Sequence, residues 1–558
     1  MSKKGAQILV ETLIEEGTEY IFGYPGGSVL PLFDALYGAP IKFILTRHEQ
    51  GAAHAADGYA RATGRVGVCV ATSGPGATNL TTGIATANMD SVPMVAITGQ
   101  VKTNLIGNDA FQEADMTGIT RSITKHNYLL KDIRDLARVV KEAFHVARTG
   151  RPGPVLVDIP VDITTAELEG EPDKTLRLPG YKPVIEGHPR QIRAAAAAIN
   201  EAQRPILYIG GGVITSGASG ELRAIAEAAQ IPVVMTLMGL GAFPGDHPLA
   251  LGMLGMHGTA TANYAVTESD LVIAVGARFD DRVTGRIDAF APGAKVVHID
   301  VDPTSISKNI PVHIPVVGDA RHILSELLPQ LRLAPREAWH AQITDWKRKH
   351  PLAYNNTGSG RIKPQAVIQE LCRQLPEQSI VCTEVGQNQM WTALWYTFRR
   401  PRTLISSGGL GTMGFGLPAA IGAQIGCPDR TVVDVAGDGS IQMNIQEMAT
   451  AVQYKLPVKI IVLNNGCLGM VRQWQELFYG KRYSQTLLQC TPDFVKLADA
   501  FGAHGLRVSD PSQVGDVLRE TLRTEGPVIV DVVVEPEENV FPMVPAGQAI
   551  NRMIGGMA

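Results

Sequence analysis

Ten short apolar runs, rich in Val and Ile, recur along the sequence and lack the polar alternation of half-exposed strands. Segments with a helical pattern, such as 191–202 and 446–454, lie between them. A run that is apolar on both faces is typical of a parallel strand covered by helices, so the pattern predicts doubly wound α/β domains. The predicted strands are residues 66–72, 93–98, 154–159, 205–210, 232–237, 271–276, 295–302, 431–437, 459–465 and 527–534.

Two polar segments divide the 558 residues into three blocks. Residues 167–190 and 335–364 are rich in charged residues, Pro, Gly or Asn, and we expect them to be linkers. The outer blocks resemble each other, since 153–162 nearly matches 526–535, and 66–79 resembles 431–444. We predict one fold used twice, at 1–166 and 365–545, around a different α/β domain at 190–335. The general likeness of buried strands is the alternative explanation.

Composition and charge exclude several classes of protein. Hydrophobic residues make up 45% of the chain and charged residues 19%, which rules out a disordered chain. No apolar run approaches the ~18 residues of a membrane span, and the N-terminus is unlike a signal peptide. A net charge of −4 argues against a nucleic-acid binder. Six scattered cysteines indicate reduced thiols, so we expect a cytoplasmic protein that binds neither nucleic acid nor membrane.

The strongest motif is GDGS at 437–440, followed by LNNG at 463–466. Gly437 and Gly439 allow a sharp turn and a close approach of the backbone to a phosphate. Asp438 offers a carboxylate oxygen and Asn465 an amide oxygen, each at the end of an apolar strand. Together with diphosphate oxygens, such ligands suit Mg²⁺.

GDG with a downstream NN resembles the motif of thiamine-diphosphate enzymes, and nearly the whole chain resembles the acetohydroxyacid synthase (acetolactate synthase) catalytic subunits. The resemblance implies a thiamine-diphosphate-binding fold for the first and third domains and a Rossmann-like fold for the middle one. The segments that carry it are YPGG (24–27), RHEQGAAHAADGYAR (47–61), TSGPGATN (72–79), DAFQE (109–113), LMGLGAFP (237–244), LGMLGMHG (251–258), GARFDDRVTG (276–285), SGGLGTMGFGLPAA (407–420) and GMVRQWQELFY (469–479).

The resemblance also implies an activity. Pyruvate would be decarboxylated, and the hydroxyethyl carbanion held on thiamine diphosphate would attack a second pyruvate or 2-ketobutyrate. The products are 2-acetolactate or 2-aceto-2-hydroxybutyrate, at the first common step of branched-chain amino acid biosynthesis. The implied cofactors are thiamine diphosphate, Mg²⁺ and FAD. The implied partners are a second copy of the chain, in a homodimer or larger oligomer, and a small regulatory subunit.

Other functions compete with this interpretation. A pyruvate oxidase would use FAD as electron acceptor, although the RFDDR and QW motifs speak against it. A catabolic acetolactate synthase would act without FAD. Glyoxylate carboligase usually lacks the glutamate found here at 49, and a non-catalytic assembly protein would not retain both halves of a cofactor site.

The resemblance assigns Glu49 to proton exchange with the aminopyrimidine ring of the cofactor; a helix-opening glutamate is the alternative. Phe111, Gln112 and Gly27 would also lie in the active site, although Phe111 is also compatible with a core position and Gln112 with a loop cap. Met413 would hold the cofactor bent, or simply fill a gap. Asn388 stands where relatives commonly have His. The remaining thiamine-diphosphate positions are Pro25, Pro75, Asn79, Gly386, Gln387, Gly411, Gly437, Asp438, Gly439, Ser440 and Asn465, with Asp438, Asn465 and Cys467 as metal ligands.

Met256, Arg282 and Trp474 resemble the pocket for the second substrate, where Arg282 could bind the carboxylate of a keto acid. A salt bridge of Arg282 with Asp280 or Asp281 is the alternative. Lys102, Asn104 and Val161 depart from residues common in the family at the channel mouth, where inhibitors often bind. The positions that resemble an FAD site are Arg151, Gly210, Gly211, Gly212, Thr236, Leu237, Met238, His257, Gly276, Arg278, Asp300 and Asp319.

Overall fold

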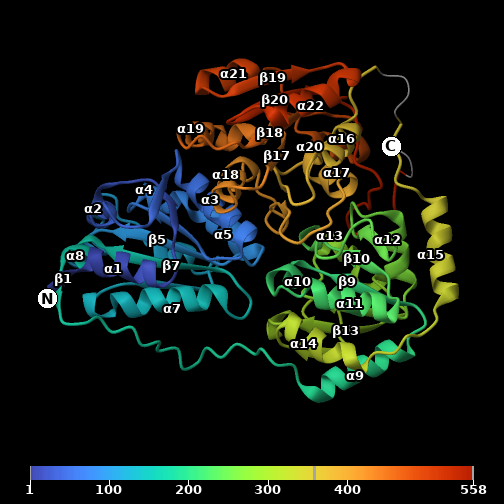
Figure 1. The fold of residues 1–558 in the computed structure, drawn as a ribbon, viewed down its shortest axis with the longest axis horizontal. Helices are drawn as coiled ribbons and strands as arrows, with labels where there is room; N and C mark the ends of the chain where they lie inside the picture. Colours follow the sequence, from blue (N-terminus) through green and yellow to red (C-terminus); the bar gives the residue numbers. More distant parts are fainter. Residues whose placement is uncertain (1, 356–359, 556–558) are drawn as a thin grey trace.

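A computed structural model describes residues 2–355 and 360–555. Figure 1 shows three bodies along the chain, coloured blue to cyan, green to yellow, and gold to red. Each body contains one six-stranded sheet in which every strand pairs parallel to its neighbours. A small antiparallel pair joins β1 (Ser2–Lys4) to β8 (Glu167–Glu169). The predicted fold class, three parallel α/β domains, is confirmed.

The first and third sheets have the same topology. In chain order within each domain, both run 2-1-3-4-6-5, as β3-β2-β4-β5-β7-β6 and as β16-β15-β17-β18-β20-β19. The two pairs of similar sequences fall on equivalent strands, because β7 corresponds to β20 and β4 to β17. The strands are β2 (Tyr20–Gly23), β3 (Lys42–Leu45), β4 (Gly67–Ala71), β5 (Met94–Gln100), β6 (His126–Leu129) and β7 (Pro154–Pro160), and then β15 (Ile380–Thr383), β16 (Leu404–Ile405), β17 (Val432–Gly437), β18 (Lys459–Asn464), β19 (His504–Val508) and β20 (Val528–Val533).

The middle sheet is wound differently. Its order, β11-β10-β9-β12-β13-β14, is 3-2-1-4-5-6 in chain order, the order of dinucleotide-binding Rossmann domains. In such a sheet the topological switch point lies between β9 and β12, where ligands bind at the carboxyl ends. The strands are β9 (Pro205–Ile209), β10 (Val233–Met235), β11 (Ala250–Met253), β12 (Leu271–Val275), β13 (Lys295–Asp300) and β14 (Ile314–Val317).

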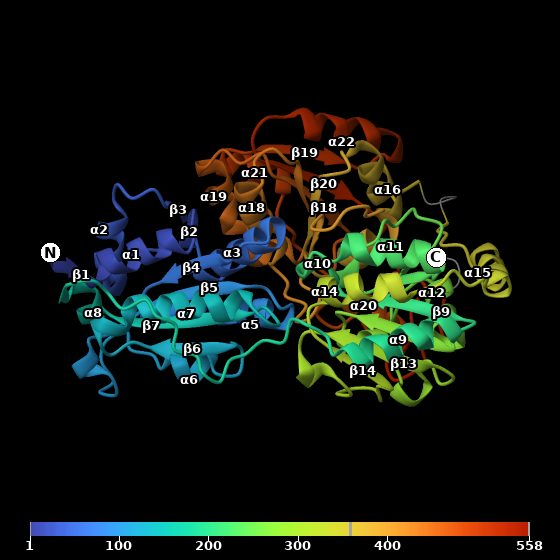
Figure 2. The same ribbon diagram turned by 60° about the horizontal axis from the view of Figure 1, so that its bottom comes forward.

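Helices cover both faces of each sheet (Figures 1 and 2). The first domain has α1 (Gly5–Glu15), α2 (Leu30–Leu36), α3 (Glu49–Thr63), α4 (Pro75–Asn79), α5 (Thr81–Met89), α6 (Met116–Thr120), α7 (Leu136–Arg148) and α8 (Val161–Thr165). The second has α9 (Pro189–Glu201), α10 (Gly211–Thr215), α11 (Ser219–Ala229), α12 (Ala260–Glu268), α13 (Asp281–Thr284), α14 (Ala320–Leu327) and α15 (Glu337–Lys349). The third has α16 (Pro364–Gln374), α17 (Gln387–Trp395), α18 (Gly416–Gly426), α19 (Met448–Gln453), α20 (Gly469–Phe478), α21 (Phe494–Phe501) and α22 (Val514–Arg523).

All ten predicted strands are present, and the strands that were missed are short or lie at sheet edges. The segment between β8 and α9 crosses to the middle domain in extended form, as a linker should (Figure 2). The second expected linker is only partly one, because it contains α15. This helix has few apolar residues, but Trp339 anchors it to the middle domain. Trp339 is buried, and its Nε1 donates to the Pro205 carbonyl oxygen at 3.1 Å. Residues 356–359 of that segment lie outside the described residues.

The first and third domains meet through α3 and α18, which occupy equivalent positions in the two copies of the fold. Both helices consist mainly of Ala and Gly on the facing sides, and the apolar cluster around them runs continuously between the two domains. A Cβ placed on Gly58 would lie 2.1 Å from the Ala419 carbonyl oxygen, and one on Gly422 would lie 1.8 Å from that of Ala55. The two backbones are therefore in direct contact, without room for even a methyl group.

We expect Gly422→Ala to destabilise the protein by about 1–3 kcal/mol, because the new methyl group must displace backbone rather than a flexible side chain. Gly220→Ala is the matched control, since it also lies in a helix and a Cβ there meets nothing within 4 Å. That control should leave stability unchanged or raise it slightly. Thermal unfolding midpoints of the two variants test this; equal midpoints would contradict close packing at this interface.

Candidate active site

The two halves of the strongest motif lie side by side in the third domain. Asp438 follows β17 and Asn465 follows β18, and these strands are parallel neighbours with Gly437 opposite Leu463. The Asn465 Oδ1 atom accepts from the Cys467 backbone N–H at 3.1 Å, and its Nδ2 donates to Gln387 Oε1 at 3.3 Å. Carboxyl ends of adjacent parallel strands converge at one edge of a sheet, which explains why residues 27 positions apart meet.

The Asp438 carboxyl group is suited to a cation. It is 1% exposed, its Oδ2 atom has no hydrogen-bond partner among the described residues, and burial raises its pKa to about 7. A buried carboxylate oxygen without a partner is costly unless a positive charge satisfies it. The sulfur of Cys467 is a soft ligand, so at this residue the backbone carbonyl oxygen is the group that suits a hard cation. Within the described residues, no cluster of three His, Cys, Asp or Glu side chains could hold a metal. This donor set therefore leaves most of an octahedral shell to phosphate oxygens or water.

The side chain of Asn388 is used within the domain. Its Nδ2 atom donates to the carbonyl oxygens of Glu384, at 3.0 Å, and Val435, at 2.8 Å. Both amide hydrogens therefore bind backbone near the ends of β15 and β17 rather than pointing out to a ligand. Gly386 precedes α17, and the buried Gln387 donates from Nε2 to Gln473 Oε1 at 2.8 Å.

Glu384, which the sequence analysis did not select, connects two predicted cofactor segments. Its Oε2 atom accepts from the Gly414 N–H at 2.7 Å and from the Ser440 hydroxyl at 2.7 Å, while Oε1 accepts from the Leu417 N–H at 3.2 Å. The side chain is fully buried, and burial raises its pKa to about 7. Glu384 thus ties the turn after β17 to the segment that contains Met413. No motif marks it, because its partners are distant in sequence.

Gly411 and Met413 lie in the connection between β16 and α18. Gly411 is exposed and Met413 half-buried, and Gly411 and Gly414 have φ values of +73° and +83° that favour glycine. The Asn444 Nδ2 atom donates to the Gly414 carbonyl oxygen at 2.7 Å. This segment is therefore fixed by hydrogen bonds at Gly414 and exposed at Gly411.

In the first domain, Glu49 opens α3, and its Oε2 atom accepts from Asn79 Nδ2 at 2.9 Å. Asn79 ends α4, which begins at Pro75, and a Cβ on Gly74 would lie 2.8 Å from the Cα of Gln112. The structure therefore brings four predicted residues together. Pro25 and Gly27 are exposed in the turn that follows β2.

Phe111 is 88% exposed in the single chain, which excludes the alternative of a core residue. Its neighbour Gln112 has a φ of +59°, a backbone conformation that is uncommon outside glycine. The contacts of Glu49 lie in the first domain and those of Asp438 in the third.

Glu447 is a second residue that the sequence analysis missed. This buried carboxylate of the third domain accepts from the backbone N–H groups of Arg47, at 2.9 Å, and His48, at 3.0 Å. It therefore fixes the residues that lead into Glu49. Burial raises its pKa.

Two of the three predicted substrate residues are adjacent. The Met256 N–H donates to the Arg282 carbonyl oxygen at 2.7 Å, and the Val544 N–H donates to the Met256 carbonyl oxygen at 2.8 Å. The Arg282 side chain is 57% exposed and lies 4.0 Å from Asp281, a distance at which an exposed pair contributes little. Asp280 instead pairs with Arg278 at 2.5 Å.

Trp474 lies on α20, and its buried Nε1 has no partner among the described residues. The preceding Gln473 exchanges two hydrogen bonds with Val540, at 2.8 and 3.0 Å. The C-terminal segment 538–544 therefore connects the Trp474 helix to the Met256 loop.

The predicted FAD residues of the middle domain lie mostly near the carboxyl ends of its strands. Gly210 and Gly212 follow β9 and pack directly on Gly276, which follows β12, so their lack of a side chain also has a packing explanation. Asp300 ends β13 and accepts from the Asp302 N–H at 2.9 Å, whereas Asp319 caps α14. Gly211 lies beside Met238.

The remaining predicted FAD residues include one from another domain. Arg151, from the first domain, contacts Asp302 at 3.3 Å. Thr236 caps the turn that contains Leu237 and Met238. The buried His257 has an Nδ1 atom without a partner in the described part of the chain, and burial lowers its pKa to about 4.

Comparisons with known proteins give one consistent result. Three family models match the chain: the thiamine pyrophosphate enzyme N-terminal TPP binding domain over residues 3–119, the central domain over 192–327, and the C-terminal TPP binding domain over 384–532. The chain is 50% identical to the probable acetolactate synthase large subunit of Methanocaldococcus jannaschii, over 99% of this chain and 95% of that protein. It is also 50% identical to the acetolactate synthase large subunit of Haemophilus influenzae and to the isozyme 3 large subunit of Escherichia coli, over 98% or more of each chain. In the described residues, no helix has the length and apolar character needed to cross a membrane.

Asp434 provides a test of the electrostatics beneath the site. Both carboxylate oxygens are buried without a partner among the described residues, and burial together with nearby Glu384 raises its pKa well above the ordinary value. A folded-state pKa above the unfolded value means that stability falls as pH rises, by up to about 1.4 kcal/mol per pH unit. We expect Asp434→Asn to stabilise the protein more at pH 8 than at pH 5, whereas Asp516→Asn, at an exposed site, should show no such difference. Thermal midpoints at both pH values decide the matter, and parallel shifts of the two variants would contradict it.

Proposed function

This chain belongs to the acetolactate synthase family of thiamine pyrophosphate enzymes, and on that premise we propose how its own residues perform the reaction. Its function is acetolactate synthesis in branched-chain amino acid biosynthesis. We propose pyruvate as the donor and pyruvate or 2-ketobutyrate as the acceptor. The observation that best supports a cofactor site is the pairing of Asp438 and Asn465 at adjacent strand ends. The buried Oδ2 atom of Asp438 has no hydrogen-bond partner among the described residues.

We propose that the turn after β17 holds Mg²⁺ and the diphosphate of the cofactor. Asp438, Asn465 and the Cys467 carbonyl would coordinate the ion, and the backbone N–H groups of the turn would face the phosphates. Bound thiamine diphosphate supplies the carbanion chemistry that the side chains of a protein lack. The Met413 side chain, on a segment that Glu384 and Asn444 hold, would support the cofactor in a bent shape.

We propose that Glu49 moves a proton at the aminopyrimidine ring. Asn79 orients its carboxyl group, while Glu447 fixes the backbone before it. We propose that a second copy of the chain supplies the opposite half of each site. Large apolar side chains beside these segments support this pairing, since they are exposed in the single chain: Tyr24 (41%), Phe111 (88%), Leu410 (44%) and Met443 (55%).

For the acceptor, we propose that Arg282 binds the carboxylate and that Met256 and Trp474 form the apolar wall of the pocket. The exposed, weakly paired guanidinium of Arg282 supports this role. An extra methylene group contributes only about 1–3 kcal/mol, so a Trp wall would favour 2-ketobutyrate without excluding pyruvate.

We propose that the middle domain binds FAD. Its role would not be redox chemistry, because no step of acetolactate formation needs a change of oxidation state. The Rossmann strand order, with Gly210, Gly276 and Asp300 at the carboxyl ends of β9, β12 and β13, supports a dinucleotide there. The His257 Nδ1 atom, which has no hydrogen-bond partner among the described residues, is a further polar group suited to a ligand. We also propose a small regulatory subunit as partner, because the relatives are named large subunits, and domain boundaries at 1–166, 190–335 and 365–545.

Product analysis tests the proposed function. The protein receives thiamine diphosphate, Mg²⁺ and pyruvate, alone or with 2-ketobutyrate, with and without FAD, while both products and oxygen uptake are measured. We expect 2-acetolactate and 2-aceto-2-hydroxybutyrate without matching oxygen uptake, and activity that depends on FAD. Oxygen or quinone consumption without acetolactate would identify an oxidase. Full activity of a colourless protein would exclude the flavin instead.

Glu49→Gln tests the proton-transfer role. The amide keeps the shape of the side chain but cannot exchange the proton, so we expect turnover to fall by about 10²–10⁴-fold with little change in thermal midpoint. A glutamate that merely opened α3 would contribute about 0.3–1 kcal/mol to stability and leave turnover intact. Thiamine diphosphate binding, measured by titration, should change little.

Mixing subunits tests the shared site with the same variant. Glu49→Gln and Asp438→Asn are each expected to be inactive alone. After dissociation and reassociation of the two, a mixed dimer contains one site with both residues intact, so about a quarter of the activity should return. Absence of recovery in verified mixed dimers would assign both residues to a site within one chain.

A further inference from the structure

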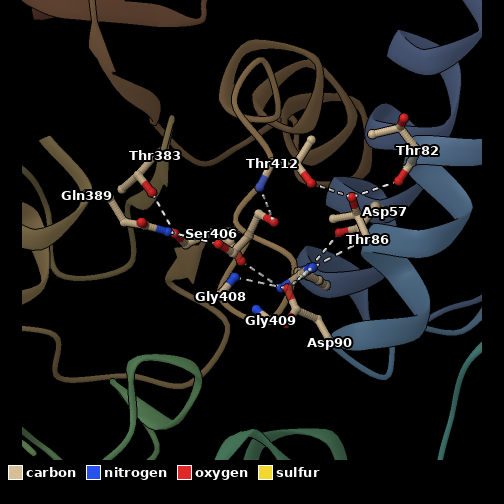
Figure 3. A network of polar contacts seen from close by, with 12 residues as sticks. Asp57, Thr82, Thr86, Asp90, Thr383, Gln389, Ser406, Gly408, Gly409 and Thr412 are labelled. Carbon is tan, nitrogen blue, oxygen red and sulfur yellow. Dashed lines mark hydrogen bonds and ion pairs between the residues drawn. The ribbon is translucent and has the colours of Figure 1, made fainter. Parts of the chain in front are cut away.

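Residues 406–414, here called the Met413 segment, lie where the three domains of one chain meet. The third domain holds its start through Ser406, whose Oγ atom is 2.6 Å from Thr383 Oγ1 and accepts from Gln389 Nε2 at 2.8 Å. In the middle domain, Met238 lies so close to Gly408 that a Cβ there would be 2.4 Å from its sulfur atom. Contacts to Gly408, Gly409 and Thr412 come from the first domain (Figure 3).

Asp90, at the end of α5 in the first domain, binds the backbone of this segment directly. Its Oδ2 atom accepts from the Gly408 N–H at 3.1 Å, and its Oδ1 atom accepts from the Gly409 N–H at 2.7 Å (Figure 3). The carboxyl side chain is 1% exposed. A buried carboxylate that accepts from two consecutive N–H groups fixes the orientation of both peptide units.

Arg61 of α3 balances the negative charge of the buried Asp90 carboxylate. Its Nη2 atom donates to Asp90 Oδ2 at 2.9 Å, its Nε donates to Asp57 Oδ1 at 2.5 Å, and its Nη1 donates to the Ser406 carbonyl oxygen at 2.9 Å. One guanidinium thus serves two buried carboxylates. Only Asp90 bonds to the Met413 segment, whereas Asp57 acts through Arg61.

A second contact fixes the segment closer to Met413. The hydroxyl oxygens of Thr86, in α5, and Thr412 are 2.7 Å apart, and the Thr412 N–H donates to Ser407 Oγ at 3.0 Å (Figure 3). Between these anchors lie the exposed Leu410 and Gly411. The segment is therefore held on both sides of the residues that face outward.

We propose that Asp90 is a positioning residue for thiamine diphosphate, through which the first domain of each chain shapes the Met413 segment of the same chain. This inference rests on the proposed function, because it takes the Met413 segment to support the bent cofactor. Asp90 does not touch the cofactor. The Asp90 carboxylate sets two peptide orientations on one side of the exposed Leu410 and Gly411, whereas Glu384 and Asn444 hold Gly414 on the other side. Asp90 therefore fixes the end of the segment that leads into Gly411.

Asp90→Asn and Asp57→Asn form a matched pair for the test. Both remove one negative charge beside Arg61, and both side chains are buried in the same network. Only the Asp90 variant brings an amide NH₂ group toward two backbone donors. We expect the thiamine diphosphate concentration for half-maximal activity to rise about tenfold or more in Asp90→Asn relative to Asp57→Asn, as loss of a charge-assisted hydrogen bond implies. The KM for pyruvate and the thermal midpoint without thiamine diphosphate should differ little between the two variants.

Equal thiamine diphosphate requirements in the two variants, within twofold, would overturn the proposal. If Asp90→Asn does not fold, Thr412→Val replaces it, since it removes only the hydroxyl contact with Thr86. We expect that variant to need a few times more thiamine diphosphate at an unchanged pyruvate KM, and no change would likewise overturn the proposal. The unmodified protein separates the two hypotheses: failure to bind thiamine diphosphate or to form acetolactate contradicts the proposed function, whereas normal behaviour with an unaffected Asp90→Asn contradicts only the positioning role.

Discussion

The contact between α3 and α18 is the constraint on which the rest of the site depends. Gly58 and Gly422 let the two helices touch backbone to backbone, and buried Ala residues of both helices surround the contact. Hydrogen bonds are directional, so those that join the first and third domains require this placement. Glu447 reaches the backbone of Arg47 and His48, and Asp90 reaches Gly408 and Gly409, because the helices fix the distance.

The first and third domains share one topology, but equivalent side chains in the two domains have different partners. Asn79 and Asn444 occupy equivalent positions after β4 and β17. The first orients the Glu49 carboxyl group and the second holds the Gly414 carbonyl oxygen beside the Met413 segment. The equivalent asparagines therefore support two different features, a side chain at the start of α3 in the first domain and a backbone turn before α18 in the third.

The equivalent aspartates of β7 and β20 show how a neighbour changes the chemistry of one position. Asp158 accepts from Thr98 at 2.7 Å and from Gln100 at 3.0 Å, and burial raises its pKa to about 7. Asp531 instead accepts from Arg507 Nε at 2.9 Å. The same position thus has only neutral side-chain donors in the first sheet and a guanidinium donor in the third. Several carboxylates are buried in this chain, and the hydrogen-bond partners of each one differ.

The strands and the duplicated fold, together with the pairing of GDGS and LNNG at adjacent strand ends, were predictable from the sequence, because they depend on patterns within a few residues or on one strand–helix–strand unit. The sequence also placed Glu49 near Asn79 and Met256 near Arg282, through resemblance to a family. It could not find Glu384, Glu447 or Asp90, each of which lies outside any cofactor motif and bonds to backbone 30 to 400 residues away. It also missed α15, because this helix has few apolar residues and is stabilised by their packing against the middle domain. A carboxylate acquires its partners when distant strands and helices pack together, so the buried acids that hold the Met413 segment and the residues before Glu49 are visible only in the folded chain.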